Sequence, residues 1–131
     1  MRRMVILCFI LVSVSGILTA QATDAGLEID GLIVDETHTR MGSDFYDLFY
    51  THWEPPPQAR NFTIIIMEQP VPQMGTRITL KVNDDEAAQF MLQPRYEMIE
   101  EFAKESVRYL QRHLEERELM RQRLEREGAA F

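Results

Sequence analysis

Cysteine is almost absent from the chain, and the only one, Cys8, lies in an apolar stretch at the N-terminus. The rest of the chain therefore has no thiol that could form a disulfide, attack a substrate or bind a metal. The histidines His38, His52 and His113 show no metal-ligand spacing with one another, and no HExxH, P-loop or GxGxxG motif is present. These absences predict a protein that uses no metal, no cofactor and no recognisable catalytic centre.

Positive charge is also scarce, with 14 Lys and Arg against 21 Asp and Glu and a net charge of −7. A chain this acidic is unsuited to sequence-independent nucleic-acid binding, which relies on Lys and Arg to neutralise phosphates. The length of 131 residues is enough for one domain with a modest core. We therefore expect a single acidic domain that does not bind nucleic acid.

An export signal is predicted over residues 1–22, and it would be cleaved. Arg2 and Arg3 form a short positive start, residues 4–18 are mostly apolar, and residues 20–22, Ala-Gln-Ala, offer the small-x-small pattern that signal peptidase cleaves. A membrane anchor is the alternative, but the apolar run has 15 residues, whereas a spanning helix needs roughly 20. Cleavage there would remove both arginines and no acid, leaving a net charge of −9.

The first half of the exported part predicts a strand followed by a helix. Residues 23–36 contain apolar positions that suggest a short edge strand, and from Thr39 the apolar spacing becomes helical. The helical stripe consists of Met41, Phe45, Leu48, Phe49 and Trp53. The three prolines 55–57 cannot continue a helix, so it should end near Trp53.

The second half predicts an antiparallel meander and a second helix. Strands are expected over residues 61–68, 76–82 and 87–93, separated by a proline-rich loop up to Gly75 and an Asn-Asp-Asp turn. The strongly β-prone first strand should be central, although at an edge it could pair with another chain. A helix should then begin near Pro94.

The predicted fold is α+β, a small antiparallel sheet of three to four strands with two helices packed on one face. The α+β domain should cover residues 23–114. Residues 115–131, rich in Glu and Arg, should form either a solvated helix extension or a frayed tail.

Aromatic residues are concentrated in the first predicted helix. Five lie within nine residues: Phe45, Tyr46, Phe49, Tyr50 and Trp53. One interpretation places the phenylalanines and the tryptophan in the core, with the tyrosines covering its edge. The other places Tyr46, Tyr50 or Trp53 in a protein interface, where Tyr and Trp are enriched. The residues alone therefore indicate a binding module and no visible active site.

The stretch GLIVDETHTRMGSDFYDLFYTHWE, residues 31–54, resembles the CsgE family of curli assembly and transport components. The shared pattern comprises Gly31-Leu32, Asp35 with Thr37, Gly42, Asp44-Phe45-Tyr46, Phe49 and Trp53-Glu54. It continues with Asn61-x-Thr63-Ile64, Glu68-x-Pro70, Gly75, Ile78-Thr79, Val82-Asn83 and Gln89-x-x-Leu92. The resemblance covers roughly residues 29–111, most of the exported part.

The resemblance implies a non-enzymatic periplasmic adaptor of curli secretion. The resemblance implies a ring-shaped homo-oligomer that caps the outer-membrane channel CsgG. It also implies that the protein guides or holds back the amyloid subunit CsgA. They need no small-molecule substrate. Interface candidates are Tyr46, Tyr50, Trp53, Met74 and Arg77.

Two other functions remain as alternatives. One is a stand-alone periplasmic chaperone or inhibitor that binds exposed strands without a channel partner. The other, from a different class, is a small hydrolase that depends on His52.

The chain also departs from the family pattern, because Met74 stands where an aromatic is expected before Gly75, and prolines 55–57 stiffen a connector.

Overall fold

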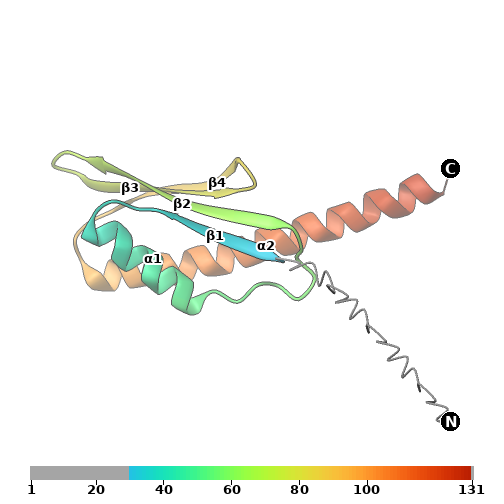
Figure 1. Ribbon diagram of the computed structural model, residues 1–131, viewed down its shortest axis with the longest axis horizontal. Helices are drawn as coiled ribbons and strands as arrows, with labels where there is room; N and C mark the ends of the chain where they lie inside the picture. The colour runs from blue at the N-terminus through green and yellow to red at the C-terminus, as the bar shows by residue number, and fades with distance from the viewer. Residues whose placement is uncertain (1–29, 131) are drawn as a thin grey trace, which may run out of the picture.

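A computed structural model describes residues 30–130 as two helices and a four-stranded sheet (Figure 1). The predicted signal, residues 1–22, lies outside the described residues. The elements, in chain order, are β1 (Gly31–Glu36), α1 (Arg40–His52), β2 (Phe62–Val71), β3 (Gly75–Val82), β4 (Asp85–Leu92) and α2 (Tyr96–Ala129). The α+β class, with two helices and four strands, is confirmed.

The sheet has the order β1-β2-β3-β4 and is mixed. The predicted antiparallel meander is present as β2, β3 and β4, and β2 is central as expected. β1 differs from the expectation of an antiparallel sheet, because it pairs with β2 in parallel, from Gly31 opposite Phe62 to Glu36 opposite Met67. The reason is the connection: α1 carries the chain back between the two strands, so both run in the same direction.

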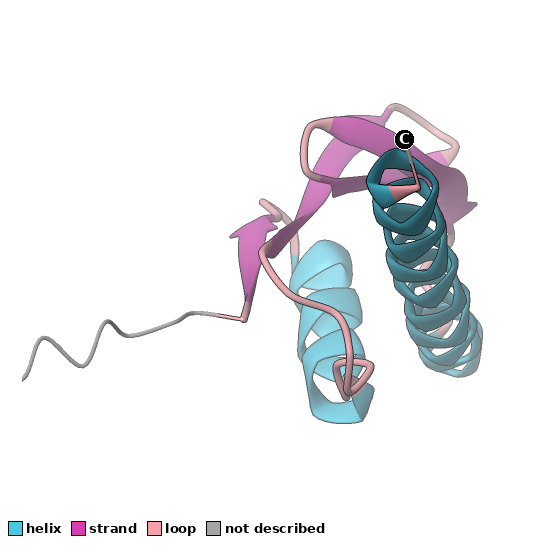
Figure 2. Ribbon diagram, turned by 90° about the vertical axis from the view of Figure 1, so that its right-hand side faces the viewer, coloured by secondary structure: helices cyan, strands magenta, loops and turns pink. Residues whose placement is uncertain are grey.

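Both helices lie on the same face of the sheet, as predicted, and Figure 2 shows them side by side beneath it. Alternate residues of β2 and β3 point into the layer between sheet and helices. The fully buried side chains there are Phe45, Phe49, Ile64, Ile66, Ile78, Leu80, Val82, Leu92 and Leu110. One apolar core therefore supports every element.

The β2–β3 hairpin is longer than the sequence predicted. The proline-rich segment was expected to form a loop, yet Pro70 pairs with Thr76 and Val71 with Gly75, which leaves a short turn. β1 pairs with β2 only as far as Met67, so Pro70 lies where no neighbouring strand on that side needs its missing donor. Gly75 has φ +102, and a Cβ there would lie 2.0 Å from the carbonyl oxygen of Leu92.

The second helix is much longer than the body it packs on. α2 has 34 residues, and its last buried side chain is Leu114. The charged stretch after that residue is helical to Ala129 and projects past the end of the sheet (Figure 1). Between residues 30 and 130, no helix combines the length and the apolarity that crossing a bilayer requires.

Candidate interaction surfaces

A buried carboxylate fixes the start of α1. Glu68, on β2, is only 7% exposed. It accepts hydrogen bonds from the backbone N–H of His38 at 2.6 Å and of Thr39 at 2.8 Å, and from the Thr39 hydroxyl at 2.5 Å. The Thr39 hydroxyl in turn accepts from the N–H of Gly42 at 3.2 Å and caps the helix.

The electrostatics of Glu68 follow from these contacts. Burial alone would raise its pKa, but the hydrogen bonds from the Thr39 side chain and from the backbone of His38 and Thr39 outweigh it and hold the pKa below the ordinary value. A carboxylate also suits the positive N-terminal end of a helix. Glu68 is therefore a structural anion that joins β2 to α1.

Three of the predicted interface residues lie together, two on α1 and Trp53 as its C-cap. The rings of Tyr46 and Tyr50 stack at 6.0 Å, and Trp53 stacks on buried Phe49 at 5.4 Å. Tyr50 is 61% exposed, whereas Tyr46 and Trp53 pack partly on the core. The two earlier interpretations of these aromatics therefore apply to different residues: Tyr50 is at the surface and the other two bridge core and surface.

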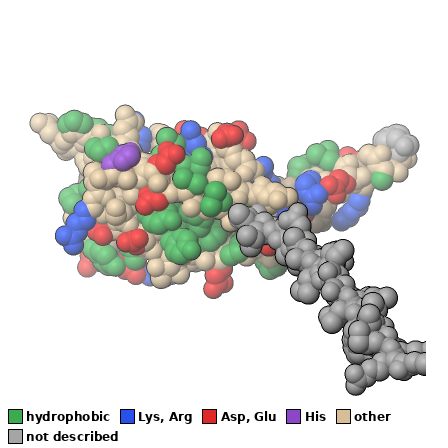
Figure 3. Space-filling view, in the orientation of Figure 1, with side chains coloured by type: hydrophobic (Ala, Val, Ile, Leu, Met, Phe, Trp, Pro, Cys, Tyr) green, Lys and Arg blue, Asp and Glu red, His purple; other side chains and the backbone are tan. Residues whose placement is uncertain are grey.

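Tyr50 and Trp53 border a surface hollow that we call the β1 groove. It is lined by Asp30, Gly31, Leu32, Ile33, Tyr50, Trp53, Pro55 and Phe62. Figure 3 shows hydrophobic side chains gathered over β1 and the end of α1 on this face. Leu32 is 49% exposed and points to the face of the sheet away from α1, so the β1 edge has an exposed apolar side chain on each face, Leu32 on one and Tyr50 on the other.

Acidic side chains stand beside the β1 groove. Burial, and then the negative charges of Asp35 and Asp47 together with neighbouring Tyr50, raise the pKa of Tyr46. The carboxylates of Asp35, on β1, and Asp47, on α1, therefore both lie near Tyr46. The side of the β1 groove next to Asp35 and Asp47 is therefore negatively charged.

The other two predicted interface residues belong to the β2–β3 hairpin. Met74 is 62% exposed at its turn, and Arg77 donates a hydrogen bond to the side chain of Gln69 at 3.0 Å across the two strands. β2 has ten residues, so the hairpin turn lies about 30 Å along the strand from the groove. The structure therefore places the five candidates in two separate surfaces and not in one.

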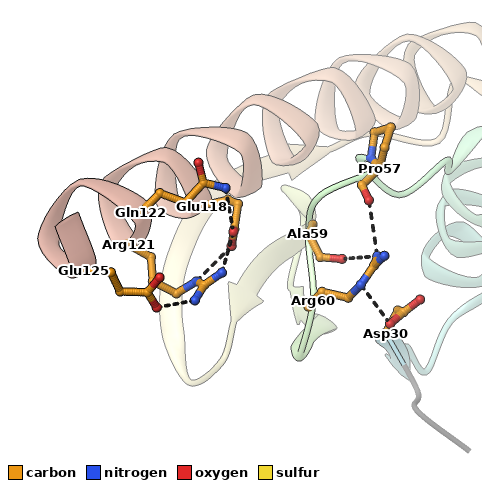
Figure 4. Close-up of polar contacts among 8 residues, drawn as sticks. All are labelled: Asp30, Pro57, Ala59, Arg60, Glu118, Arg121, Gln122 and Glu125. Carbon is orange, nitrogen blue, oxygen red and sulfur yellow. Dashed lines mark hydrogen bonds and ion pairs between the residues drawn. The ribbon is translucent and has the colours of Figure 1, made fainter. Parts of the chain in front are cut away.

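The segment between α1 and β2 is held in place by Arg60. Its guanidinium pairs with Asp30 at 3.3 Å and donates to the carbonyl oxygens of Pro57 and Ala59 (Figure 4). Gln111 of α2 donates to the carbonyl oxygen of Glu54 at 2.9 Å. These contacts tie the segment to α2 and to Asp30, which lines the β1 groove and is paired there with a cation.

The projecting part of α2 forms a third exposed surface. Arg121 bridges Glu118 and Glu125, as Figure 4 shows. Leu119, Met120 and Leu124 are each more than half exposed there. The hydrogen bonds from Arg121 and Gln122 hold the pKa of Glu118 below its usual range.

The described residues do not assemble a metal centre. Among residues 30–130, no three His, Cys, Asp or Glu side chains gather closely enough to hold an ion. His52 is the exposed last residue of α1, where a cation suits the helix C-terminus. His113 stacks on Tyr109 at 6.2 Å.

The family match covers most of the chain. A family model described as "Curli assembly protein CsgE" matches residues 29–129. The chain belongs to the CsgE family. The resemblance inferred from residues 31–54 is therefore confirmed.

Curated relatives carry the same description. The "Curli production assembly/transport component CsgE" of Salmonella typhi is 33% identical over 73 residues, which cover 56% of this chain and 53% of that protein. Its counterpart in Escherichia coli O6:H1 is 35% identical over 68 residues, covering 52% and 50%. The chain spans about half the length of the curated relatives that it matches.

The role of Glu68 is the feature that sequence reasoning missed. Glu68 and Gly42 both belong to the motif on which the resemblance rested, but the motif does not say that they meet. In the structure a Cβ at Gly42 would lie 2.2 Å from Glu68 Oε2, so the glycine leaves room for the carboxylate. The signal that could have found this was the pairing of a glycine early in a helix with an acid on a strand of apolar residues.

Proposed function

We propose that this CsgE-family protein is a non-enzymatic periplasmic adaptor of curli secretion. It docks on the periplasmic mouth of a CsgG-type outer-membrane channel and holds back or guides an unfolded CsgA-type amyloid subunit. The predicted signal at residues 1–22 would deliver it to the periplasm. Family membership supports the assignment to curli assembly, and the channel and the cargo are part of the proposal.

The observation that carries the proposal is the separation of the exposed apolar surfaces on one body. The β1 groove and the β2–β3 turn lie at different ends of β2, and the same core supports both. An adaptor must contact a channel and a cargo at the same time, which requires distinct surfaces. A hydrolase would instead require a convergent set of polar groups, and His52 stands exposed at a helix end.

The protein would act as a ring of identical copies. A closed ring requires a head-to-tail interface in which two different surfaces of each copy meet. Exposed Leu119, Met120 and Leu124 on the projecting part of α2 offer one apolar surface for such a contact. Arg77 and Met74 on the hairpin, distant from the groove, are the surface that we assign to the channel.

Binding to the purified channel tests this proposal. The protein as exported is titrated onto a CsgG-type channel in nanodiscs, and affinity and stoichiometry are measured by mass photometry or sedimentation. Met74→Ser and Arg77→Ala should each weaken binding by about tenfold or more, as expected for residues central to an interface. Tyr96→Ala, equally exposed at the start of α2, is the matched control and should bind normally.

The outcomes separate the alternatives. Normal docking by both hairpin variants would contradict the assignment of this surface. Failure of the wild-type protein to bind a functional channel, with amyloid growth still delayed, would favour the stand-alone chaperone. Reproducible turnover that is lost in His52→Ala would favour the hydrolase.

A further inference from the structure

The outer edge of β1 carries main-chain groups that pair with no other described residue. The carbonyl oxygen of Asp30 accepts from the N–H of Phe62, so peptide groups of even-numbered residues along β1 face β2. Those of Ile33 and Asp35 consequently face away from the sheet. Within residues 30–130, no hydrogen bond reaches their main-chain N–H or carbonyl groups on that side.

The other sheet edge is less accessible. The hydroxyl of Tyr109 donates to the carbonyl oxygen of Ala87 at 2.9 Å and so occupies part of the β4 edge. β4 also begins with two acids, Asp85 and Glu86. Charge and coverage both discourage strand pairing at an edge.

At its apolar end, the β1 edge has neither charged residues nor a side chain among the described residues that covers it. Residues 31–34 are Gly-Leu-Ile-Val, without charge or proline. The β1 groove runs beside them, with exposed Tyr50 and half-exposed Leu32 available for the side chains of a bound segment. An open strand edge next to apolar pockets is the arrangement by which β-augmentation sites bind extended peptides.

The charged residues around the β1 edge determine which charge a bound peptide segment should carry. Asp35 and Glu36 lie at the end of β1, and Asp47 lies nearby on α1. Asp30, at the other end, is already paired with Arg60. The excess charge is therefore negative and concentrated at the C-terminal end of β1.

We propose that β1 is the cargo site of the protein, where an extended, β-prone segment with a basic side chain adds to the sheet as a fifth strand. The segment hydrogen-bonds to Ile33 and Asp35, its apolar side chains contact Leu32 on one face of the sheet and Tyr50 on the other, and its Lys or Arg meets Asp35 and Asp47. Only the identity of the natural occupant, an unfolded amyloid subunit, rests on the proposed function. A strand held in this way has one edge covered, which slows its pairing with further subunits.

A second copy fits this site less well. A copy that paired through its β4 edge would bring Asp85 and Glu86 toward an edge that is itself acidic. Pairing of like charges opposes association. A basic segment meets no such repulsion.

The test uses a defined probe in solution, without any channel. The probe is a capped synthetic peptide of alternating threonine and valine with a lysine at each end. A second peptide has glutamate in place of each lysine, and a third carries backbone N-methyl groups on alternate residues. Binding is measured by fluorescence anisotropy, and hydrogen exchange of the Ile33 and Asp35 amides reports whether the strand has been added.

The expected result is tighter binding of the lysine peptide than of the other two, with slowed exchange at Ile33 and Asp35. Tyr50→Ala and Leu32→Lys should each weaken it by about tenfold. Tyr96→Ala, at a site of similar exposure, should leave it unchanged.

Three results would overturn the inference. Absence of binding at peptide solubility, or protection at residues elsewhere, removes β1 as the site even if the protein still docks on the channel. Protection of the β1 amides in the free protein that grows with concentration assigns the edge to a second copy. Protection that is independent of concentration assigns it to another segment of the same chain. Failure to dock on the channel with intact β1 binding contradicts the proposed function alone.

Discussion

At the residue scale, Glu68 shows how a single carboxylate can join two elements. It is surrounded by donors from His38 and Thr39 and excludes a side chain at position 42. Hydrogen bonds to a charged group contribute more than neutral ones, and removing the charge leaves buried donors without a partner.

Glu68→Gln should therefore lower the free energy of unfolding by about 2–4 kcal/mol near neutral pH. Chemical denaturation monitored by circular dichroism measures this loss. Glu116→Gln, on the exposed side of α2, is the control and should change little.

The same residue predicts a pH dependence. Because the folded pKa of Glu68 lies below the ordinary value of about 4.5, its contribution is complete above that value and disappears as the pH falls through the folded pKa. The difference in unfolding free energy between wild type and Glu68→Gln should therefore shrink in acid. A difference that stayed constant from neutral to acidic pH would contradict the role of the charge.

Gly75 makes a second prediction at this scale. Its φ of +102 and the 2.0 Å approach of a Cβ to the Leu92 carbonyl oxygen leave no room for alanine. Gly75→Ala should lower the unfolding free energy by at least about 2 kcal/mol. Gly128→Ala is the matched control, because nothing lies within 4 Å of a Cβ there and alanine favours a helix. Equal stability of the two variants would be evidence against the hairpin geometry.

At the element scale, the sequence predicted the helices and the meander because their apolar periods are strong. It did not predict that β1 joins in parallel, because pairing depends on where the α1 crossover delivers the chain. The proline-rich hairpin was also misjudged, since Pro70 is tolerated only where β1 has already ended. Both errors concern partners distant in the sequence, which local propensity does not report.

The junction of α1 with β2 gives a prediction about coupling. Gly42→Ala should destabilise the protein although alanine favours a helix, because its Cβ would lie 2.2 Å from Glu68 Oε2. In a Glu68→Ala background the same change should cost much less. A double-mutant cycle of unfolding free energies measures the coupling, and additive effects would show that the two residues do not meet.

The projecting part of α2 should be dispensable for folding. Leu114 is the last buried side chain of α2, and the apolar side chains after it, Leu119, Met120 and Leu124, are each more than half exposed. Deletion of residues 120–131 should change the unfolding free energy by less than about 1 kcal/mol, measured by chemical denaturation. A collapse of cooperative unfolding would show that this stretch belongs to the core.

At the scale of the whole molecule, the interface candidates illustrate what sequence can and cannot place. Tyr50 and Met74, two of the predicted interface residues, are large exposed side chains. That they lie on different surfaces, and that Trp53 is stacked between Phe49 and the groove, follows from the packing of α1 against β1 and β2. The open β1 edge became visible only once strand order was known.

At this scale we propose that the CsgE-family protein closes a CsgG-type channel. Single-channel conductance of a CsgG-type pore in a planar bilayer, with the protein added to the periplasmic side, tests it most directly. We expect stepwise, concentration-dependent closure that Met74→Ser weakens and Tyr96→Ala does not. Unchanged conductance, with a verified pore and a folded protein, would contradict it.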